Sequence, residues 1–527
     1  MRMIGSLPSF RYSRSPGLTL VAFGVVLLLA YEAAQLVLDG DINSLILSAM
    51  VFAGLAVVVA ILNNWRRGVY LLLTWVVFED LARKYLGNNM AVFFGKDILA
   101  LVVYLSFFIS RRAGRTRIFK PPFFLPLMLF VWYGVIQVFN PLSTSIFFGL
   151  LGMKIDFLYV PLIFIGYGFI ESDDDLRQFF AYNSVLVLIV VGLGIAQSVL
   201  GHTFLNPAVM QSDIRELSSN YRVSPLTGAI AYRPTSVFVS AGRMQDFLLI
   251  SWLVALGFGG YLLLRSKKNR LLAFLTVGVV GIGSIMSASR SVFLYTAGSV
   301  LVVVAAFLWG SPWRQGEARR TVRAIMRGAI FAALALFLMM TFLPEQIGSR
   351  FAIYRETLSP DSPASELTVR VRDYPWHNLM LAFQHEHWPL GYGIGTSSLG
   401  VQYVARILHV PAMNIGVESG YGQLIVEMGV PGLLLWLLLS VSVSVSAWKV
   451  VVKLKGTPWF PIGFVIFWYA FLLMIPITFY GFVAYQDFIM NAYLWILLGI
   501  LFRLPTLLQD EVQAQLVAQQ AVAPGQA

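Results

Sequence analysis

One arginine set among serines, in Ser287-Ala288-Ser289-Arg290-Ser291, is the first feature of this sequence that suggests chemistry. The run stands between two apolar stretches, 270–289 and 291–309, where the chain turns back. A guanidinium presents paired N–H donors in a fixed plane, and these match two oxygens of one phosphate. Arg290 is therefore a candidate phosphate ligand, and an interfacial anchor is the alternative role.

Two polar segments contain further arginines close to aromatic residues and glycines. The first, 201–243, contains Tyr232-Arg233-Pro234-Thr235 and ends with Gly242-Arg243. The second, 344–419, contains Arg370, Arg372 and Trp376, and then Pro389-Leu390-Gly391-Tyr392-Gly393-Ile394-Gly395. Alternating glycines let backbone amides approach a ligand closely, although a plain turn explains the same run. Together these arginines predict a binding site for an anion.

Proton transfer would fall to carboxylates and histidines of the second polar segment. Glu418 ends that segment just before an apolar stretch, and Glu427 lies nine residues further on. A carboxylate at this boundary can act as a general base, whereas the alternative is a carboxylate favoured by a helix N-terminus. Further candidate bases are His377, His385, His387 and His409. His385 and His387 lack an evident third ligand and the chain has no cysteine, so the sequence predicts neither a metal site nor a cofactor.

The composition places these residues in a membrane protein. Of the 527 residues, 58% are hydrophobic and 12% charged, and the mean hydropathy is +0.75. A soluble domain is about 45–50% apolar and about 25% charged. We therefore predict an all-α polytopic membrane protein with a single membrane domain and fourteen spans of about 20 apolar residues each. The predicted spans are roughly 17–38, 42–62, 68–86, 91–110, 122–140, 153–170, 180–200, 244–264, 270–289, 291–309, 327–343, 420–446, 460–480 and 488–503.

The distribution of Lys and Arg predicts the orientation of these spans. With the N-terminus in the cytoplasm, 24 of the 38 Lys and Arg fall in cytoplasmic segments and 12 in external ones. Both termini, including the tail 509–527, are then cytoplasmic, and 201–243 and 344–419 are external loops. Long loops between short ones are usually functional, and a passive cap is the alternative. The excess of positive charge (net charge +12) then lies mostly in cytoplasmic segments at the membrane surface, so we expect no nucleic-acid partner.

Ionisable residues within the predicted spans fall in the outer halves of these spans. They include Glu32, Glu79, Asp80, Lys96, Asp97, Lys154, Asp156, Asp246, Glu427 and Asp487. Interfacial placement explains individual cases, and Lys96–Asp97 and Lys154–Asp156 are candidate local pairs. The one-sided distribution favours a polar chamber open to the outside, because a transporter with a central site needs polar groups near the midplane.

In their order, these motifs resemble the O-antigen ligase and Wzy-type polysaccharide polymerase family. The matching residues are Ser289-Arg290, Arg370 or Arg372, Trp376, the three glycines Gly391, Gly393 and Gly395, and then Glu427, Gly429 and Gly432. The resemblance covers roughly residues 230–440. It departs from the family at one place, because the family's histidine–asparagine pair falls on Glu418-Ser419. We expect the His377-Asn378 pair beside Trp376 to be a coincidental dipeptide.

The resemblance implies a glycosyltransferase of the bacterial inner membrane. Its donor would be a glycan on a polyprenyl diphosphate and its acceptor a sugar hydroxyl, with Arg290 and Glu418 as catalytic residues. The implied substrate-binding residues are Arg233, Arg243, Arg370, Arg372, Trp376, Gly393, Gly395 and Glu427. The implied partners are the lipid-linked oligosaccharide, membrane lipids, and candidate flippase, chain-length and export proteins.

The missing histidine favours a polymerase of repeat units, making an exopolysaccharide or O-antigen, over an O-antigen ligase. Two more functions stay open, a lipid-linked sugar flippase or polysaccharide transporter, and a non-catalytic assembly subunit. A flippase would need matching charges in the cytoplasmic halves of the spans, and the sequence shows almost none there. Transfer by one displacement inverts the anomeric carbon, whereas a covalent carboxylate route retains it.

Overall fold

The computed structural model describes most of the chain after residue 53. The described residues are 54–86, 90–114, 118–207, 220–224, 227–265, 268–312, 330, 334, 337–338, 340–358, 372–411, 413 and 416–522. The chain divides into two units, Met1–Gly68 and Val69–Ala527. In the first unit, the described part is an apolar helix, Gly54–Asn63, and the start of α3 (Trp65–Leu86). All other elements belong to the second unit.

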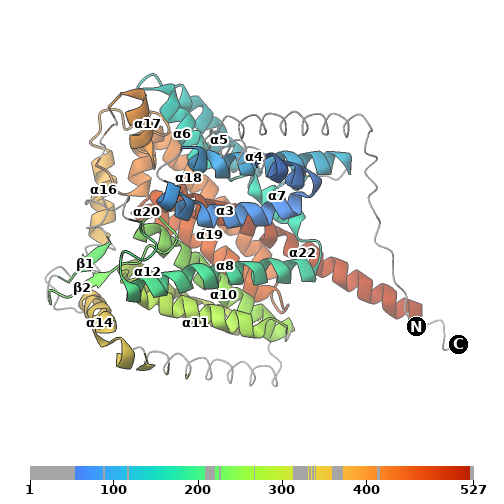
Figure 1. The fold of residues 1–527 in the computed structure, drawn as a ribbon. Coiled ribbons are helices and arrows are strands. Elements are labelled where there is room, and N and C mark those ends of the chain that lie inside the picture. Colours follow the sequence, from blue (N-terminus) through green and yellow to red (C-terminus); the bar gives the residue numbers. More distant parts are fainter. Residues whose placement is uncertain are drawn as a thin grey trace, which may run out of the picture. The chain divides into compact units, whose positions relative to one another are not determined.

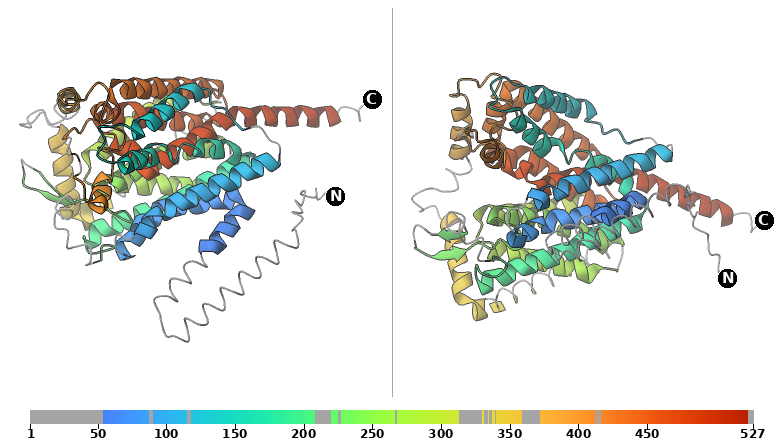
Figure 2. Two further views of the ribbon diagram at one scale, coloured as in Figure 1. Left: turned by 90° about the horizontal axis from the view of Figure 1, so that it is seen from above. Right: turned by 45° about the horizontal axis from the view of Figure 1, so that its top comes forward.

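The second unit consists mainly of helices that lie side by side with roughly aligned axes (Figure 1 and Figure 2). The longer helices are α4 (Met90–Ala113), α8 (Asp173–Leu200), α10 (Ala241–Arg265), α11 (Arg270–Met286), α12 (Arg290–Gly310), α18 (Gly420–Lys453), α19 (Phe460–Leu472) and α22 (Phe488–Val522). Three shorter ones are α5 (Phe124–Val138), α6 (Ile146–Phe157) and α7 (Leu162–Phe169). The apolar half of α22 packs against α7, α18 and α19, so it lies in the core of this unit.

The two long polar segments meet at one end of the helices, on the left in Figure 1. The first contributes a hairpin in which β1 (Tyr221–Val223) pairs antiparallel with β2 (Ile230–Tyr232). The second contributes α14 (Pro344–Leu358), α16 (Tyr374–Ala382) and α17 (Val401–Leu408). The C-terminal part of α22 extends beyond the opposite end.

Within the described residues, eight helices are long and apolar enough to cross a membrane. Three further apolar helices are shorter, namely Gly54–Asn63, α5 and α11. The structure therefore supports an all-α polytopic membrane protein, while fourteen spans stay a prediction. The predicted span 17–38 lies outside the described residues, as does most of 327–343. The predicted span 153–170 begins earlier, because α6 and α7 together form the apolar stretch Ile146–Phe169.

Two helices depart from regular geometry near the end of the unit where the two polar segments meet, which we call the crowded end. In α18, Gly429 has φ 67° and ψ −174°, and Pro431 follows within the helix. After α19 comes a π-helical turn (η3, Leu473–Ile477) that contains Pro476, and then α20 (Thr478–Tyr480) and α21 (Val483–Gln486). Such breaks free backbone groups that other segments must satisfy.

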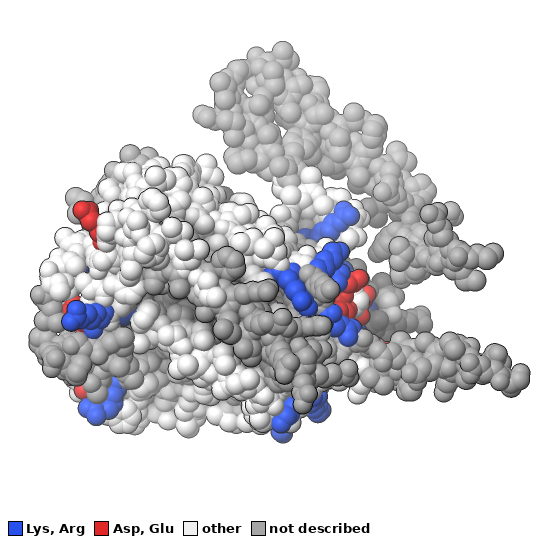
Figure 3. Space-filling model, turned by 90° about the horizontal axis from the view of Figure 1, so that it is seen from below, with Lys and Arg blue, Asp and Glu red and all other residues white. Residues whose placement is uncertain are grey.

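The surface of the described residues fits a membrane protein. Figure 3 shows Lys and Arg gathered toward the two ends of one face, and the described residues between them are mainly uncharged. Large apolar side chains such as Leu125, Leu271 and Leu301 are exposed on the helices. In water such exposure would be unfavourable, whereas lipid chains would cover it.

The predicted orientation can be tested with a single cysteine, because the chain has none of its own. Met380→Cys places a thiol on α16, at a position that is 38% exposed. We expect a membrane-impermeant maleimide to label it in intact cells, since α16 belongs to the predicted external loop. Lys453→Cys, at the exposed end of α18, is the matched control and should react only after the membrane is broken. The opposite pattern would overturn the orientation.

Candidate functional site

The start of α12 combines a buried arginine with the positive end of a helix. Arg290 is the first residue of α12 and is only 6% exposed. Ser289 caps the helix by accepting a hydrogen bond from the Val292 N–H at 3.4 Å, and the first turn contains no acidic residue. A helix N-terminus carries partial positive charge. The guanidinium adds to that field, and an anion such as phosphate would complement both.

Arg233 approaches the same turn through Gln245 of α10. With the Gln245 amide oriented so that its oxygen faces Arg233, that oxygen accepts hydrogen bonds from Arg233 Nε at 3.2 Å and Nη2 at 2.5 Å. The amide nitrogen then donates to Ser289 Oγ at 3.0 Å. Burial and the nearby charge of Arg222 lower the pKa of Arg233. The structure thus joins two of the predicted motifs, and Arg222 adds a third cation.

Helix α14 of the large loop holds this turn in place. Arg350, only 2% exposed, donates from Nε to Met286 O at 2.9 Å and from Nη2 to Tyr232 O at 3.0 Å. Its neighbour on the helix, Tyr354, donates from its hydroxyl to Ile285 O at 2.8 Å and stacks on Phe293, with ring centroids 4.5 Å apart. Because Arg350 bonds the end of α11 and strand β2 at once, it fixes the cationic turn relative to the hairpin.

Glu418 lies at the other side of the crowded end, where the large loop returns to α18. Its side chain is exposed and accepts a hydrogen bond from the Tyr374 hydroxyl of α16. Its backbone N–H donates to Asn378 Oδ1 at 3.1 Å, and Asn378 Nδ2 donates to Tyr374 O at 3.0 Å. The sequence predicts that His377-Asn378 is a coincidental dipeptide, and this stays a prediction. The structure places Asn378 beside Glu418, because helix α16 packs against the start of α18.

The short helix α20 packs against the start of α18, next to Glu418. Ser419 caps α18 and donates from Oγ to Phe479 O at 2.9 Å. A Cβ on Gly420 would lie 2.1 Å from Thr478 O, so only glycine allows this approach. Tyr480, the last residue of α20, lies near Tyr295 of α12. Helix α20 is therefore packed against the start of α18 and lies near the first half of α12.

The glycine turn after α16 is built into the kink of α18. Pro431 has no N–H to donate to Glu427 O, and the left-handed Gly429 opens the helix there. The freed carbonyls accept from the loop instead: Tyr392 N–H bonds Val426 O at 2.8 Å, and Gly393 N–H bonds Glu427 O at 2.9 Å. In return, Val430 N–H donates to Pro389 O at 3.2 Å. We call this exchange between 389–398 and 426–430 the loop–kink joint.

Close backbone approach explains the glycines of the joint. A Cβ on Gly391 would lie 2.5 Å from Glu427 O, and a Cβ on Gly395 would lie 1.9 Å from Phe148 O of α6. Both glycines have positive φ, 80° and 86°. Helix α5 also reaches the joint, because Gln137 Nε2 donates to Leu390 O at 2.9 Å.

The Glu427 carboxylate ties the end of the glycine turn to α18. It is 1% exposed, and its Oε1 accepts from the backbone N–H and the hydroxyl of Ser397, both at 2.8 Å, and from Ser398 Oγ at 3.1 Å. Such bonds offset the cost of burying a carboxylate. We had predicted that Gly393, Gly395 and Glu427 bind substrate. Their polar groups bond or closely approach protein atoms instead, so we infer that they position the loop.

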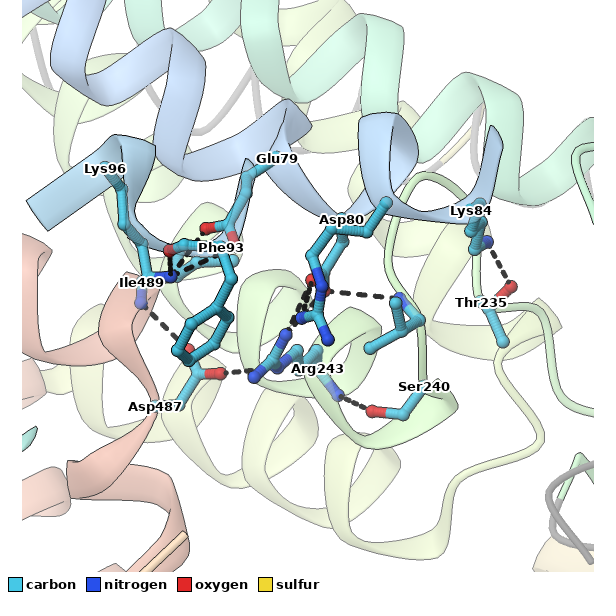
Figure 4. A network of polar contacts seen from close by, with 12 residues as sticks. Glu79, Asp80, Lys84, Phe93, Lys96, Thr235, Ser240, Arg243, Asp487 and Ile489 are labelled. Carbon is cyan, nitrogen blue, oxygen red and sulfur yellow. Dashed lines mark hydrogen bonds and ion pairs between the residues drawn. The ribbon is translucent and has the colours of Figure 1, made fainter. Parts of the chain in front are cut away.

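Arg243 belongs to a separate network of buried ion pairs (Figure 4). Its guanidinium lies between Asp80 of α3 at 2.7 Å and Asp487 at 3.1 Å. Asp80 also accepts from Arg83 at 3.2 Å. We had predicted Arg243 as a diphosphate ligand, but its position between two carboxylates indicates a structural role that holds α3, α10 and the start of α22 together.

Lysines of this network pair across helices rather than along the chain. Lys96 pairs with Glu79 at 2.9 Å, and Lys154 pairs with Asp97 at 2.6 Å. The expected local pairs Lys96–Asp97 and Lys154–Asp156 were therefore wrong. Asp156 instead accepts from Gln486 Nε2 at 3.3 Å. Neighbouring residues on a helix point in different directions, which is why a facing helix supplies the partner.

The remaining predicted residues lie on the surface of the large loop or outside the described residues. Arg372 is exposed and pairs with Asp373 at 2.6 Å, and Trp376 is 57% exposed on α16. Arg370 lies outside the described residues. The rings of His385 and His387 lie against Tyr392, with centroids 6.2 and 5.1 Å away. Within the described part of the chain, no three His, Asp or Glu side chains are grouped to hold a metal ion.

Several residues of the site were missed from the sequence. Tyr374 and Asn378 stand four apart on one helix face, a spacing that marks neighbours, but nothing in the sequence assigns them to Glu418. Gln245 and Arg350 are single polar residues whose partners lie far away along the chain. A polar residue early in an apolar helix, as Gln245 is in α10, was the only signal that could have found them.

Comparison with known proteins agrees with the motifs. Residues 275–437 match a family model described as O-antigen ligase, which is just under a third of the 527 residues. The match runs from α11 to the middle of α18 and so includes Arg290, the large loop and the loop–kink joint. It confirms the predicted resemblance. No curated protein matches the chain.

Gly395→Ala should disrupt the loop–kink joint more than backbone strain alone can explain. The added Cβ would overlap Phe148 O, and the residue has φ 86°. Gly416→Ala is the matched control, because Gly416 also has positive φ, 64°, but no atom within 4 Å of the added Cβ. We expect the control to lose about 1–2 kcal/mol and Gly395→Ala clearly more in thermal unfolding, with faster hydrogen exchange over 389–399. Equal losses in the two variants would contradict the joint.

Proposed function

We propose that this protein is a membrane glycosyltransferase that polymerises lipid-linked oligosaccharides. The starting point is the match of residues 275–437 to the O-antigen ligase family model. The protein would join repeat units carried on polyprenyl diphosphate into a polysaccharide at the outer face of the cytoplasmic membrane. The observation that carries this proposal is Arg290, a buried arginine at the first position of α12. A cation at the positive end of a helix is favourable when an anionic group binds there.

The leaving diphosphate is the group that this end of the molecule would stabilise. As the glycosidic bond breaks, negative charge grows on the diphosphate oxygen. Through Gln245 of α10, Arg233 is linked to Ser289, the residue before Arg290, and Arg222 lies near Arg233. Because Gln245 holds the Arg233 guanidinium and α14 holds the backbone on both sides of the site, little reorganisation is needed when charge develops. The α12 N-terminus would contribute its N–H groups to the same oxygens.

Glu418 is our candidate for the base that deprotonates the acceptor hydroxyl. It is exposed at the start of α18, and Tyr374 and Asn378 hold it in position. Beside it, Trp376 and Met380 follow one exposed face of α16 at a spacing of four residues. An aromatic side chain offers a flat apolar surface for the apolar face of a sugar ring. We therefore assign the acceptor glycan to the side of the site formed by α16.

O-antigen ligase is the second candidate function, because the matching family model carries that description. A ligase and a polymerase would share the lipid-linked donor and differ in the acceptor. In this chain a carboxylate, Glu418, stands where the resemblance places a histidine. This substitution is our reason for preferring the polymerase.

Arg290→Lys should lower polymer formation by about 10–100-fold while the protein remains folded and inserted. Lysine keeps the charge but loses the planar pair of donors that matches a phosphate. Arg355→Lys is the matched control, since Arg355 is an exposed arginine of α14 at the same end. Polymer can be measured by gel separation of labelled glycan. If Arg290→Lys made polymer as well as the control, Arg290 would be an interfacial anchor.

Glu418→Gln should lower the rate by about 10²–10⁴-fold, because the amide cannot accept the proton of the acceptor hydroxyl. It should leave the unfolding temperature nearly unchanged, since the side chain is exposed. Glu386→Gln, an exposed carboxylate of the same loop, is the control and should be fully active. If Glu418→Gln were active and His377→Gln were not, the base would be His377, which lies next to Asn378 on α16.

A further inference from the structure

A pocket lies at the end of the second unit opposite the large loop. It forms where α4, α7 and α22 meet, it has a cavity volume of about 190 Å³, and it is partly open to solvent. Its lining includes Phe107, Arg111, Phe119, Tyr167, Glu171 and Arg503. None of these residues belongs to the proposed glycosyltransferase site, and the pocket therefore needs an explanation of its own.

Two guanidiniums of the lining are held by the backbone where α7 ends. Arg111 Nη2 donates to Gly168 O at 3.1 Å, and Arg503 Nε donates to Ile170 O at 3.0 Å. Arg503 Nη1 also donates to Thr506 Oγ1 at 2.8 Å, and its Nη2 pairs at 3.5 Å with Asp510, whose carboxylate is exposed. Carbonyls at a helix C-terminus are natural partners for cations. They fix both guanidiniums at one pocket, where a guanidinium is well suited to binding phosphate oxygens.

The rest of the lining is aromatic and apolar. Phe119 stacks on Tyr167, with ring centroids 4.1 Å apart and planes 3° from parallel. Arg111 lies over the Phe107 ring at 5.4 Å. Ile118, which also lines the pocket, is exposed. An inorganic anion would need only the two arginines. Two arginines beside an aromatic and apolar lining fit a molecule that has a phosphate group next to a hydrocarbon part.

The position of the pocket also fits a lipid. Arg503 lies near the end of the candidate span Phe488–Asp510, and Arg111 near the end of Val92–Arg112. Arg112 and Lys120 are exposed close by in the chain. Basic pockets between helices at the membrane interface attract anionic headgroups. Glu171 adds one carboxylate to the lining, and it can accept a hydrogen bond from a headgroup hydroxyl.

We propose that this pocket binds an anionic glycerophospholipid, with its phosphodiester between Arg111 and Arg503 and a headgroup hydroxyl toward Glu171. Phosphatidylglycerol has this chemistry. The aromatic residues would contact the glycerol and the first part of the acyl chains. The site is independent of the proposed transferase reaction, and it would anchor the ends of α4, α7 and α22 to the lipid.

The test uses the full-length protein in detergent, with phosphatidylglycerol or phosphatidylcholine added stepwise. Bound lipid is counted by native mass spectrometry, and the unfolding temperature is followed in parallel. We expect phosphatidylglycerol to bind more tightly and to raise the unfolding temperature more. Equal binding of the two lipids would overturn the proposal, as would an equal rise with inorganic phosphate, because that result would indicate a site for free anions.

Single substitutions test whether phosphatidylglycerol binds at this pocket. Arg111→Gln should weaken phosphatidylglycerol binding by about tenfold, the size expected for one charge-assisted contact, and Arg111→Lys should weaken it less. Arg112→Gln is the matched control, since Arg112 is the next residue and exposed but does not line the pocket. If Arg112→Gln lost as much binding as Arg111→Gln, the lipid would be held by general surface charge and the assigned pocket would be wrong.

Discussion

The loop–kink joint is the constraint on which the arrangement of this end of the protein depends. Gly429 and Pro431 interrupt α18, and a broken helix inside a membrane must have its free carbonyls satisfied by other groups. The backbone of 389–393 supplies those groups, and Glu427 ties down Ser397 and Ser398. The same loop carries α16, which positions Glu418. A kink in one helix therefore determines where the large loop can lie.

A second feature gives the site its chemical character. Arg290 begins α12 where a carboxylate would be favoured, and Arg233 and Arg222 come close from the hairpin side. Helix α14 fixes this turn through Arg350, and α16 positions Glu418 at the start of α18. The large loop thus touches both halves of the proposed site, with α14 at the cationic half and α16 at the carboxylate half. Binding of a lipid-linked glycan between them would use the whole loop.

Composition and motif order were enough to predict a helical membrane protein, its family resemblance and the position of Arg290. They could not predict partners that only tertiary packing creates. Lys96 faces Glu79 rather than the adjacent Asp97, and Asn378 reaches the Glu418 N–H from forty residues away. The glycines after α16 were interpreted as ligand-binding because alternating glycines permit any close approach. In the structure, the groups that approach these glycines belong to α18 and α6. The α18 contact depends on the kink in that helix, and the α6 contact is the close approach of Gly395 to Phe148 O. A sequence pattern specifies neither contact.

The reaction that we propose for this protein is the lengthening of a lipid-linked glycan. The direct measurement is product analysis with purified protein in liposomes that contain one polyprenyl-diphosphate-linked repeat unit. We expect glycans of two and more repeat units on a single lipid diphosphate, with one free polyprenyl diphosphate released for each bond formed. Movement of the substrate between leaflets without any lengthening, or no lengthened product from folded protein, would contradict it.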